Sequence, residues 1–206
     1  KEKIEGYADL TFERLAFVVC RGGWPQAIDM KDEEALKQPR CYYNTYVHSD
    51  INKADNIKKN PESVKRLMRS YARSQGSQVP NTVLVHGDLV NDLRTFGFLF
   101  ETLCIRDLRI YADSLGGEVY HYRDKDGLEC DAVMHLRNGK YGLIEIKLGG
   151  DTLIEEGARN LKAMEAKIDT DKMNTPSFLM VLTGVGNYAY RRKDGVFVVP
   201  IGSLKN

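Results

Sequence analysis

Hydrophobic positions in the first part of the chain recur at the spacing of amphipathic helices. The first predicted helix has a candidate N-cap at Asp9 or Thr11 and stops at Gly22, a residue type that commonly ends helices. Two further helices are predicted, one from the thirties to about residue 50 and one over residues 61–74. We therefore expect a helical N-terminal part.

The second part of the chain changes between the periods of helices and strands. The predicted elements are a long helix (88–115), three strands (118–123, 128–136 and 141–148), a helix (153–168), a strand (177–184) and a hairpin (187–201). Asp151 or Thr152 is the candidate N-cap of the helix over residues 153–168. The last hairpin is expected to turn at Asp194 and Gly195. This order predicts an α/β (α+β) fold, a mixed sheet flanked by helices.

The composition changes between these two parts. Residues 74–82 read SQGSQVPNT, a run of Ser, Gly, Pro and Asn with few apolar side chains. The domain boundary is placed here. The result is a helical domain over residues 1–80 and an α/β domain over residues 83–206.

The register of the hairpin between residues 128 and 148 follows from its own pattern. A two-residue loop would place a charged side chain among the apolar ones. A three-residue loop with Gly139 in a left-handed conformation pairs Ala132 with Ile144 and Cys130 with Ile146. We expect this second register, because it keeps the two apolar faces together.

The same register brings charged side chains together on the other face. It places Asp131 opposite Glu145 and Glu129 opposite Lys147. Two carboxylates with Cβ atoms about 5 Å apart repel each other unless a cation lies between them. Mg²⁺ or Mn²⁺ suits such a pair, since these ions take one or two carboxylates and complete their coordination with water and phosphate oxygens. Asp131 and Glu145 are therefore candidate metal ligands, and Lys147 is a candidate catalytic residue that would orient or activate water or neutralise phosphate charge.

Glu101 lies at the centre of an apolar stripe on the predicted long helix. Its neighbours three and four positions away are apolar or small: Gly97, Phe98, Cys104 and Ile105. A glutamate in that place is costly to bury unless a cation or Lys147 satisfies it. Glu101 is therefore an accessory candidate for the site. The alternative is a surface glutamate at the edge of a broad stripe.

The whole charged cluster also has a structural interpretation. Glu129 and Lys147 would form a cross-strand ion pair, while Asp131 and Glu145 would be solvated on an open sheet face. Spacing alone leaves both interpretations open.

A basic stripe is predicted on the helix over residues 61–74. It consists of Lys65, Arg66, Arg69 and Arg73, and could contact DNA phosphates. A solvated helix face is the alternative. Across the chain, 30 Lys and Arg nearly balance 29 Asp and Glu, so any nucleic-acid site would have to be a local patch.

The remaining signals indicate an ordinary globular protein. Its 206 residues include four cysteines without CxxC spacing, which predicts reduced, mostly buried thiols in the cytoplasm: Cys20, Cys41, Cys104 and Cys130. No apolar run approaches about 20 residues, so no membrane partner is expected. His121 and His135 have no companions at metal-ligand spacing and are expected to have structural roles.

Three segments in order carry a resemblance: a helix with FGFLFETLCIRDL, a strand with GLECDAV and a strand with LIEIKLGG, followed by a further helix. This arrangement resembles the PD-(D/E)xK nuclease superfamily, whose core is a mixed sheet flanked by helices. A longer segment, residues 95–150, resembles the C-terminal region of a family of bacterial and archaeal AAA+ superfamily ATPases that carry a C-terminal domain of unknown function. The segment VVCRGGWPQAI near the N terminus resembles a short motif of the same family.

The resemblance implies a winged-helix-like section before a restriction-endonuclease-like domain, whose site falls on Glu101, Asp131, Glu145 and Lys147 with Mg²⁺ or Mn²⁺ as cofactor. It also implies an ATPase section, but no GxxxxGK[ST] phosphate loop occurs in this sequence, so ATP binding is assigned to no residue here. The stretch of residues 74–93 is shorter than in that family, which predicts a break or a long jump near residues 79–83.

Two functions fit these expectations. The first is a metal-dependent phosphodiesterase that cleaves DNA. The second is a non-catalytic DNA- or protein-binding module that gives an ATPase its specificity, with the basic stripe as its contact surface.

Overall fold

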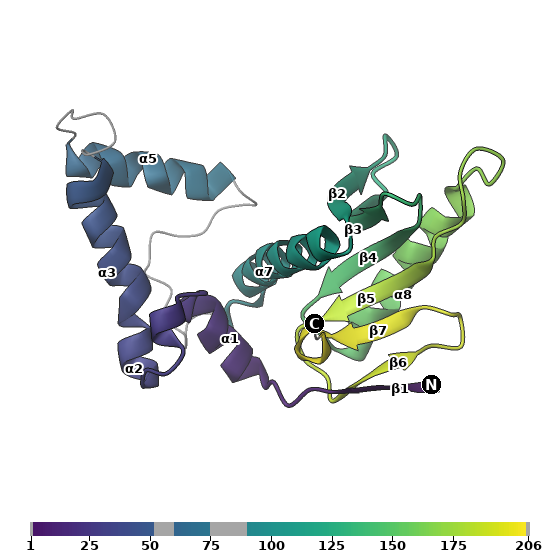
Figure 1. Ribbon diagram of the computed structural model, residues 1–206, viewed down its shortest axis with the longest axis horizontal. Helices are drawn as coiled ribbons and strands as arrows, with labels where there is room; N and C mark the ends of the chain where they lie inside the picture. Colours follow the sequence, from purple (N-terminus) through teal and green to yellow (C-terminus); the bar gives the residue numbers. More distant parts are fainter. Residues whose placement is uncertain (1, 52–59, 75–89, 205–206) are drawn as a thin grey trace. The chain divides into compact units, whose positions relative to one another are not determined.

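A computed structural model describes residues 2–51, 60–74 and 90–204 (Figure 1). The chain divides into two compact units, Lys1–Leu15 with Leu99–Asn206 and Ala16–Phe98. Residues 79–83, where the sequence predicts a break, lie outside the described residues, as does most of the predicted boundary segment.

Helices account for most of the regular structure before residue 75. They are α1 (Phe12–Arg21), η1 (Pro25–Ala27), α2 (Asp32–Ala35), α3 (Lys37–Thr45), η2 (Tyr46–Asp50) and α5 (Pro61–Ser74). Thr11 caps α1, because its Oγ1 accepts a hydrogen bond from the backbone N–H of Arg14 at 3.1 Å. Gly22 ends the helix with a φ of +74°. The helical prediction is confirmed, although the second predicted helix is divided into α2, α3 and the π-helical turn η2.

The other unit is built on a seven-stranded mixed sheet with the order β1-β6-β7-β5-β4-β3-β2 (Figure 1). The strands are β1 (Glu2–Tyr7), β2 (Gly117–Arg123), β3 (Glu129–Leu136), β4 (Tyr141–Lys147), β5 (Phe178–Thr183), β6 (Tyr188–Arg191) and β7 (Phe197–Pro200). Neighbours are parallel between β4 and β5 and between β5 and β7, and antiparallel elsewhere. The predicted mixed sheet flanked by helices is confirmed.

The N-terminal strand β1 is an element that the sequence pattern did not indicate. It pairs antiparallel with β6 and forms one edge of the sheet. Its pairing joins residues almost 190 positions apart, such as Glu2 and Arg191. A pairing over that distance leaves no local signal in the sequence.

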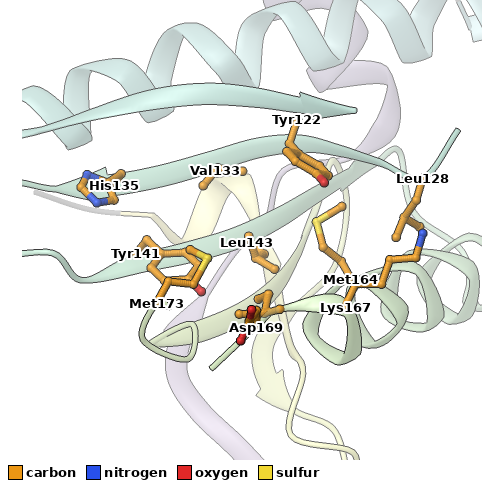
Figure 2. A pocket seen from close by; sticks show the side chains of 11 residues that line it. Tyr122, Leu128, Val133, His135, Tyr141, Leu143, Met164, Lys167, Asp169 and Met173 are labelled. Atoms are coloured by element: carbon orange, nitrogen blue, oxygen red, sulfur yellow. The ribbon is translucent and has the colours of Figure 1, made fainter. Parts of the chain in front are cut away.

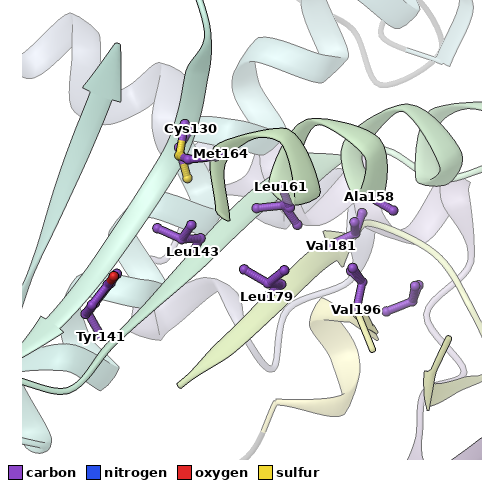
Figure 3. Packing of buried hydrophobic residues seen from close by; sticks show 10 residues of the cluster. Cys130, Tyr141, Leu143, Ala158, Leu161, Met164, Leu179, Val181 and Val196 are labelled. Atoms are coloured by element: carbon purple, nitrogen blue, oxygen red, sulfur yellow. The ribbon is translucent and has the colours of Figure 1, made fainter. Parts of the chain in front are cut away.

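Helix α8 (Asp151–Lys167) packs on one face of the sheet (Figure 3). The buried cluster between them consists of Cys130, Tyr141, Leu143, Ala158, Leu161, Met164, Leu179, Val181, Val196 and Val198. The N-cap of α8 is Gly150, and no side chain caps the helix. The predicted caps Asp151 and Thr152 are therefore wrong, since both residues lie inside the helix.

Helix α7 (Leu93–Ser114) precedes β2 and carries the predicted site residue Glu101. Asp92 caps it, because its Oδ1 accepts a hydrogen bond from the N–H of Thr95 at 3.1 Å. The buried ring of Phe100 reaches the end of β5, since a Cβ on Gly184 would lie 3.4 Å from it. The predicted start near residue 88 lies outside the described residues. None of the helices in the described ranges combines the length and apolar character needed to cross a membrane.

Candidate functional site

The hairpin of β3 and β4 has the predicted register. Ala132 pairs with Ile144, and His135 pairs with Tyr141 next to the loop. Gly139 adopts a φ of +82°, which suits the left-handed position of a three-residue loop. The register inferred from the apolar alternation is confirmed.

A bulge in β3 changes side-chain directions just before this pairing. Tyr122 of β2 pairs with Cys130, and the register shifts by one residue between this pair and Tyr120. Cys130 consequently joins the core beneath α8 instead of facing Ile146. The predicted pairing of Cys130 with Ile146 is wrong, because an extra residue on one strand leaves the apolar pattern nearly unchanged. The bulge leaves Asp131 where β3 and β4 cease to pair regularly.

The Asp131 carboxylate is held by the backbone of β4. Its Oδ2 accepts a hydrogen bond from the N–H of Ile146 at 2.7 Å. Burial raises the pKa of Asp131 above its ordinary value, while this hydrogen bond and the positive charge of Lys147 oppose that rise. Asp131 is therefore a partly buried carboxylate anchored at a fixed position between the two strands.

Glu145 and Lys147 form an ion pair on the α8 side of β4. Nζ of Lys147 lies 2.9 Å from Oε2 of Glu145. The residue Glu145 is only 2% exposed. Burial and the negative charge of Asp131 raise the pKa of Glu145, and Lys147 opposes this rise. Burial lowers the pKa of Lys147, but the charges of Glu145 and Asp131 outweigh it, so the net shift is upward. Gly157 of α8 lies against the pair, since a Cβ there would lie 3.4 Å from Cβ of Glu145.

Asn160 of α8 connects the helix to both strands of the site. Its Nδ2 donates to Oε1 of Glu145 at 3.2 Å and to the backbone carbonyl of Glu129 at 3.3 Å. Together with Lys147, it gives each oxygen of Glu145 a partner. Sequence reasoning missed Asn160, because its role depends on how α8 packs against the sheet and no local motif marks it.

Glu101 of α7 belongs to the same electrostatic cluster. Its side chain is half-buried, and burial is the largest cause that raises its pKa. The negative charges of Asp131 and Glu129 raise this pKa further, while His121 and Lys147 lower it. The charge of Asp131 thus raises the pKa values of Glu101, Glu145 and Lys147, so these three residues lie within electrostatic range of this carboxylate.

Glu129 has different partners from the predicted ones. Its carboxylate lies 2.7 Å from Nε2 of His121 and 4.0 Å from Arg123, both on β2. In the described part of the chain Lys147 pairs with Glu145 instead, so the Glu129–Lys147 ion pair of the alternative, structural interpretation is wrong. His121, for which a structural role was expected, lies at the border of the cluster and contributes to its charge balance.

The donors of this cluster fit a hard cation that keeps most of its coordination for water and substrate. Among the described residues, no three His, Cys, Asp or Glu side chains form a ready-made metal cage. Mg²⁺ is commonly held by only one or two carboxylates, with water and phosphate oxygens in the other positions. Asp131 and Glu145 are donors of that kind, and a nearby cation would offset the burial that raises their pKa values.

Comparison with known families places this site in a recognised domain. Residues 96–204 match the model of a family described as a domain of unknown function, DUF4143. This match spans more than half of the 206 residues. The chain belongs to the DUF4143 family. DUF4143 domains occur in the C-terminal region of AAA-ATPase-like proteins.

A second family model matches the helical part. It is described as a domain of unknown function, DUF8612, and covers residues 12–109. No curated protein and no solved structure matches the chain. The DUF4143 match includes all four predicted site residues, but its description carries no activity, so a functional argument has to rest on the site itself.

The predicted basic stripe lies on α5, outside the DUF4143 domain. Lys65 forms an ion pair with Glu62 at 2.9 Å, and Arg66 is exposed. The side chains of Arg69 and Arg73 lie outside the described ones. Within the described side chains, Arg66 is the stronger candidate for a phosphate contact, since Glu62 partly neutralises Lys65.

The four cysteines are free thiols, as expected. Cys104 and Cys130 are buried, Cys20 is partly buried and Cys41 is exposed, so only half of them fit the prediction of buried thiols. Burial raises the pKa of the Cys130 thiol to about 12. This thiol is therefore protonated and unreactive at neutral pH.

Replacing Glu101 with glutamine is expected to stabilise the DUF4143 domain at neutral pH. The folded-state pKa of Glu101 is raised, so its ionised form destabilises the fold above this pKa, and the penalty disappears below the ordinary value of 4.5. Thermal unfolding should show Glu101→Gln melting above wild type at pH 7.5, with no difference near pH 4.

The exposed Glu34 on α2 provides the control, because Glu34→Gln removes a carboxylate that is not buried. This control variant should not melt above wild type at either pH. A Glu101→Gln variant that melts below wild type at pH 7.5 would contradict the prediction, since the carboxylate would then make favourable contacts that outweigh its burial.

Proposed function

We propose that the DUF4143 domain of this chain is a metal-dependent phosphodiesterase that acts on DNA, and that the chain is the C-terminal part of an AAA+ ATP-binding protein. The observation that carries the proposal is the Glu145–Lys147 ion pair, close enough to Asp131 for its charge to raise the pKa values of both residues, where β3 and β4 cease to pair. The carboxyl-x-lysine order on β4 and the acidic residue on β3 agree with the resemblance to PD-(D/E)xK nucleases.

In this proposal Asp131 and Glu145 hold a Mg²⁺ or Mn²⁺ ion. When bound, such an ion withdraws charge from phosphate oxygens and lowers the pKa of a coordinated water. Asn160 keeps Glu145 oriented through Oε1, and the N–H of Ile146 keeps Asp131 in place through Oδ2. Glu101 is an accessory group that adds negative charge next to Asp131.

The protonation state of Lys147 selects its role. The charges of Glu145 and Asp131 raise its pKa, so the side chain is an ammonium at neutral pH while it is paired with Glu145. A fixed positive charge at this position stabilises the negative charge that develops on a phosphate oxygen during hydrolysis. We therefore assign Lys147 an electrostatic role in place of general-base catalysis.

The test is cleavage of supercoiled plasmid DNA by the purified chain. We expect nicking in the presence of Mg²⁺ or Mn²⁺ and none when a chelator replaces the ion. Cleavage of equal rate with chelator would contradict the proposal, because a contaminating or metal-independent activity would then account for it.

A non-catalytic DNA-binding module is the second candidate. The exposed Arg66 on α5 is the observation that favours it. This function predicts DNA affinity that falls steeply with salt concentration, because neutralised phosphates release counterions. It also predicts no plasmid cleavage under any metal condition, which separates it from the first candidate.

A further inference from the structure

A concave site lies on the α8 side of the sheet and contains none of Glu101, Asp131, Glu145 and Lys147 (Figure 2). It has a volume of about 250 Å³ and lies between strands β2 to β4, the end of α8 and the segment that follows α8. Its walls are mainly apolar and aromatic, including Tyr122, Val133, Tyr141, Leu143, Met164 and Met173. Figure 2 shows side chains from three neighbouring strands converging on it.

Three of the polar groups around this pocket have partners, while the ring of His135, which also lines it, stacks with that of Tyr141. The hydroxyl of Tyr141 donates to the backbone carbonyl of Asn174 at 2.6 Å. Nζ of Lys167 lies 2.7 Å from a carboxylate oxygen of Asp124. The Asp169 carboxylate pairs with Lys172 at 2.7 Å. An uncharged apolar ligand would leave all three of these interactions in place.

The size and lining of the pocket define the ligand further. A cavity of about 150 Å³ holds one benzene ring, so 250 Å³ has room for a substituted ring or a fused pair of rings. Met164 and Met173 offer sulfur contacts, which aromatic rings favour, and Tyr122 and Tyr141 offer ring edges and faces. We propose that this pocket binds a flat, uncharged aromatic ring.

Two sources of such a ring fit the surroundings of the pocket. One is a free small molecule. The other is an aromatic side chain on an extended segment that pairs with β2, the strand at the edge opposite β1. Tyr122 belongs to β2, lines the pocket and is 46% exposed, so a segment added to β2 would lie beside the pocket.

The experiment titrates indole into the chain labelled with ¹³C at its methionine methyl groups. The six methionines report on separate places, and only Met164 and Met173 line the pocket. We expect saturable shifts of these two methyl signals. The buried Met134 and Met180 should remain unchanged. No shift at millimolar indole, or shifts of similar size at all six methyl groups, would overturn the proposal.

Two matched variants test the location. Val133→Phe fills the pocket and should weaken indole binding at least tenfold, whereas Val119→Phe, on the other face of the neighbouring strand β2, should change it less than twofold. Equal affinity in Val133→Phe and wild type would also overturn the proposal. Since the titration of the wild-type chain is decisive alone, a variant that fails to fold leaves the test intact.

A third arm identifies the source of the ring. A short, uncharged extended peptide with one central tryptophan is compared with free indole. Affinity at least tenfold above that of indole, lost when alanine replaces the tryptophan, supports a protein segment paired with β2. Equal or weaker affinity supports a free small molecule, and both results uphold the aromatic site.

Discussion

Replacing Lys147 with methionine is expected to reduce metal-dependent DNA cleavage by about 10²–10³-fold, the usual loss when one group that stabilises transition-state charge is removed. Methionine keeps most of the apolar stem and removes the ammonium that lies 2.9 Å from Glu145. The variant therefore separates the charge from the packing against Gly157. The measurement is the initial rate of plasmid nicking at saturating Mn²⁺.

The exposed Lys140 in the loop between β3 and β4 provides the matched control, since Lys140→Met removes the same charge outside the cluster. It should retain the wild-type rate. Equal rates in Lys147→Met and Lys140→Met would rule out the electrostatic role of Lys147. A Lys147→Arg variant that recovers part of the rate would support it, because guanidinium keeps the charge with a different shape.

Replacing Asp131 with asparagine is expected to weaken Mn²⁺ binding at least about tenfold. Even the replacement of a residue that only hydrogen-bonds to a metal ligand typically lowers metal affinity about 10- to 100-fold. Asparagine keeps an oxygen that accepts the hydrogen bond from the N–H of Ile146, so the hairpin should stay intact. Calorimetric titration with Mn²⁺ measures the affinity, and thermal unfolding checks the fold.

The stability of this variant distinguishes a metal site from a structural carboxylate. Burial raises the pKa of Asp131, so its charge destabilises the metal-free fold at neutral pH. Asp131→Asn should therefore melt at or above the wild-type temperature without metal. Added Mn²⁺ should raise its melting temperature less than that of wild type. The exposed Asp113 on α7 supplies the control variant Asp113→Asn. Unchanged Mn²⁺ affinity in Asp131→Asn would contradict the assignment.

Local sequence signals were sufficient for most helix ends and for the hairpin register. Helix α1 begins after Thr11 and ends before Gly22. Both signals are local, because a hydroxyl cap and a left-handed glycine affect only the residues next to them. Ala132 and Ile144 pair because the apolar alternation and Gly139 agree on one register. The register did not extend to the charged residues, since the regular pairing stops at Ala132 and Ile144 and Glu129 contacts His121 in place of Lys147.

Features that depend on packing between distant segments were not accessible in this way. The bulge beside Asp131 shifts one strand by one residue without changing the apolar pattern, so the direction of Cys130 was predicted wrongly. Asn160 reaches Glu145 only because α8 packs over β4. Strand β1 is fixed by its partner β6, which lies at the other end of the chain.

The most direct test of the proposed metal site is a crystal structure of the chain with Mn²⁺, with the ion located by its anomalous scattering. The proposal predicts a peak about 2.1 Å from carboxylate oxygens of both Asp131 and Glu145, the usual distance for such a small divalent cation. The peak should disappear in crystals of Asp131→Asn. Well-ordered side chains with no peak between them, at a Mn²⁺ concentration that supports cleavage, would contradict the assignment of these residues as metal ligands.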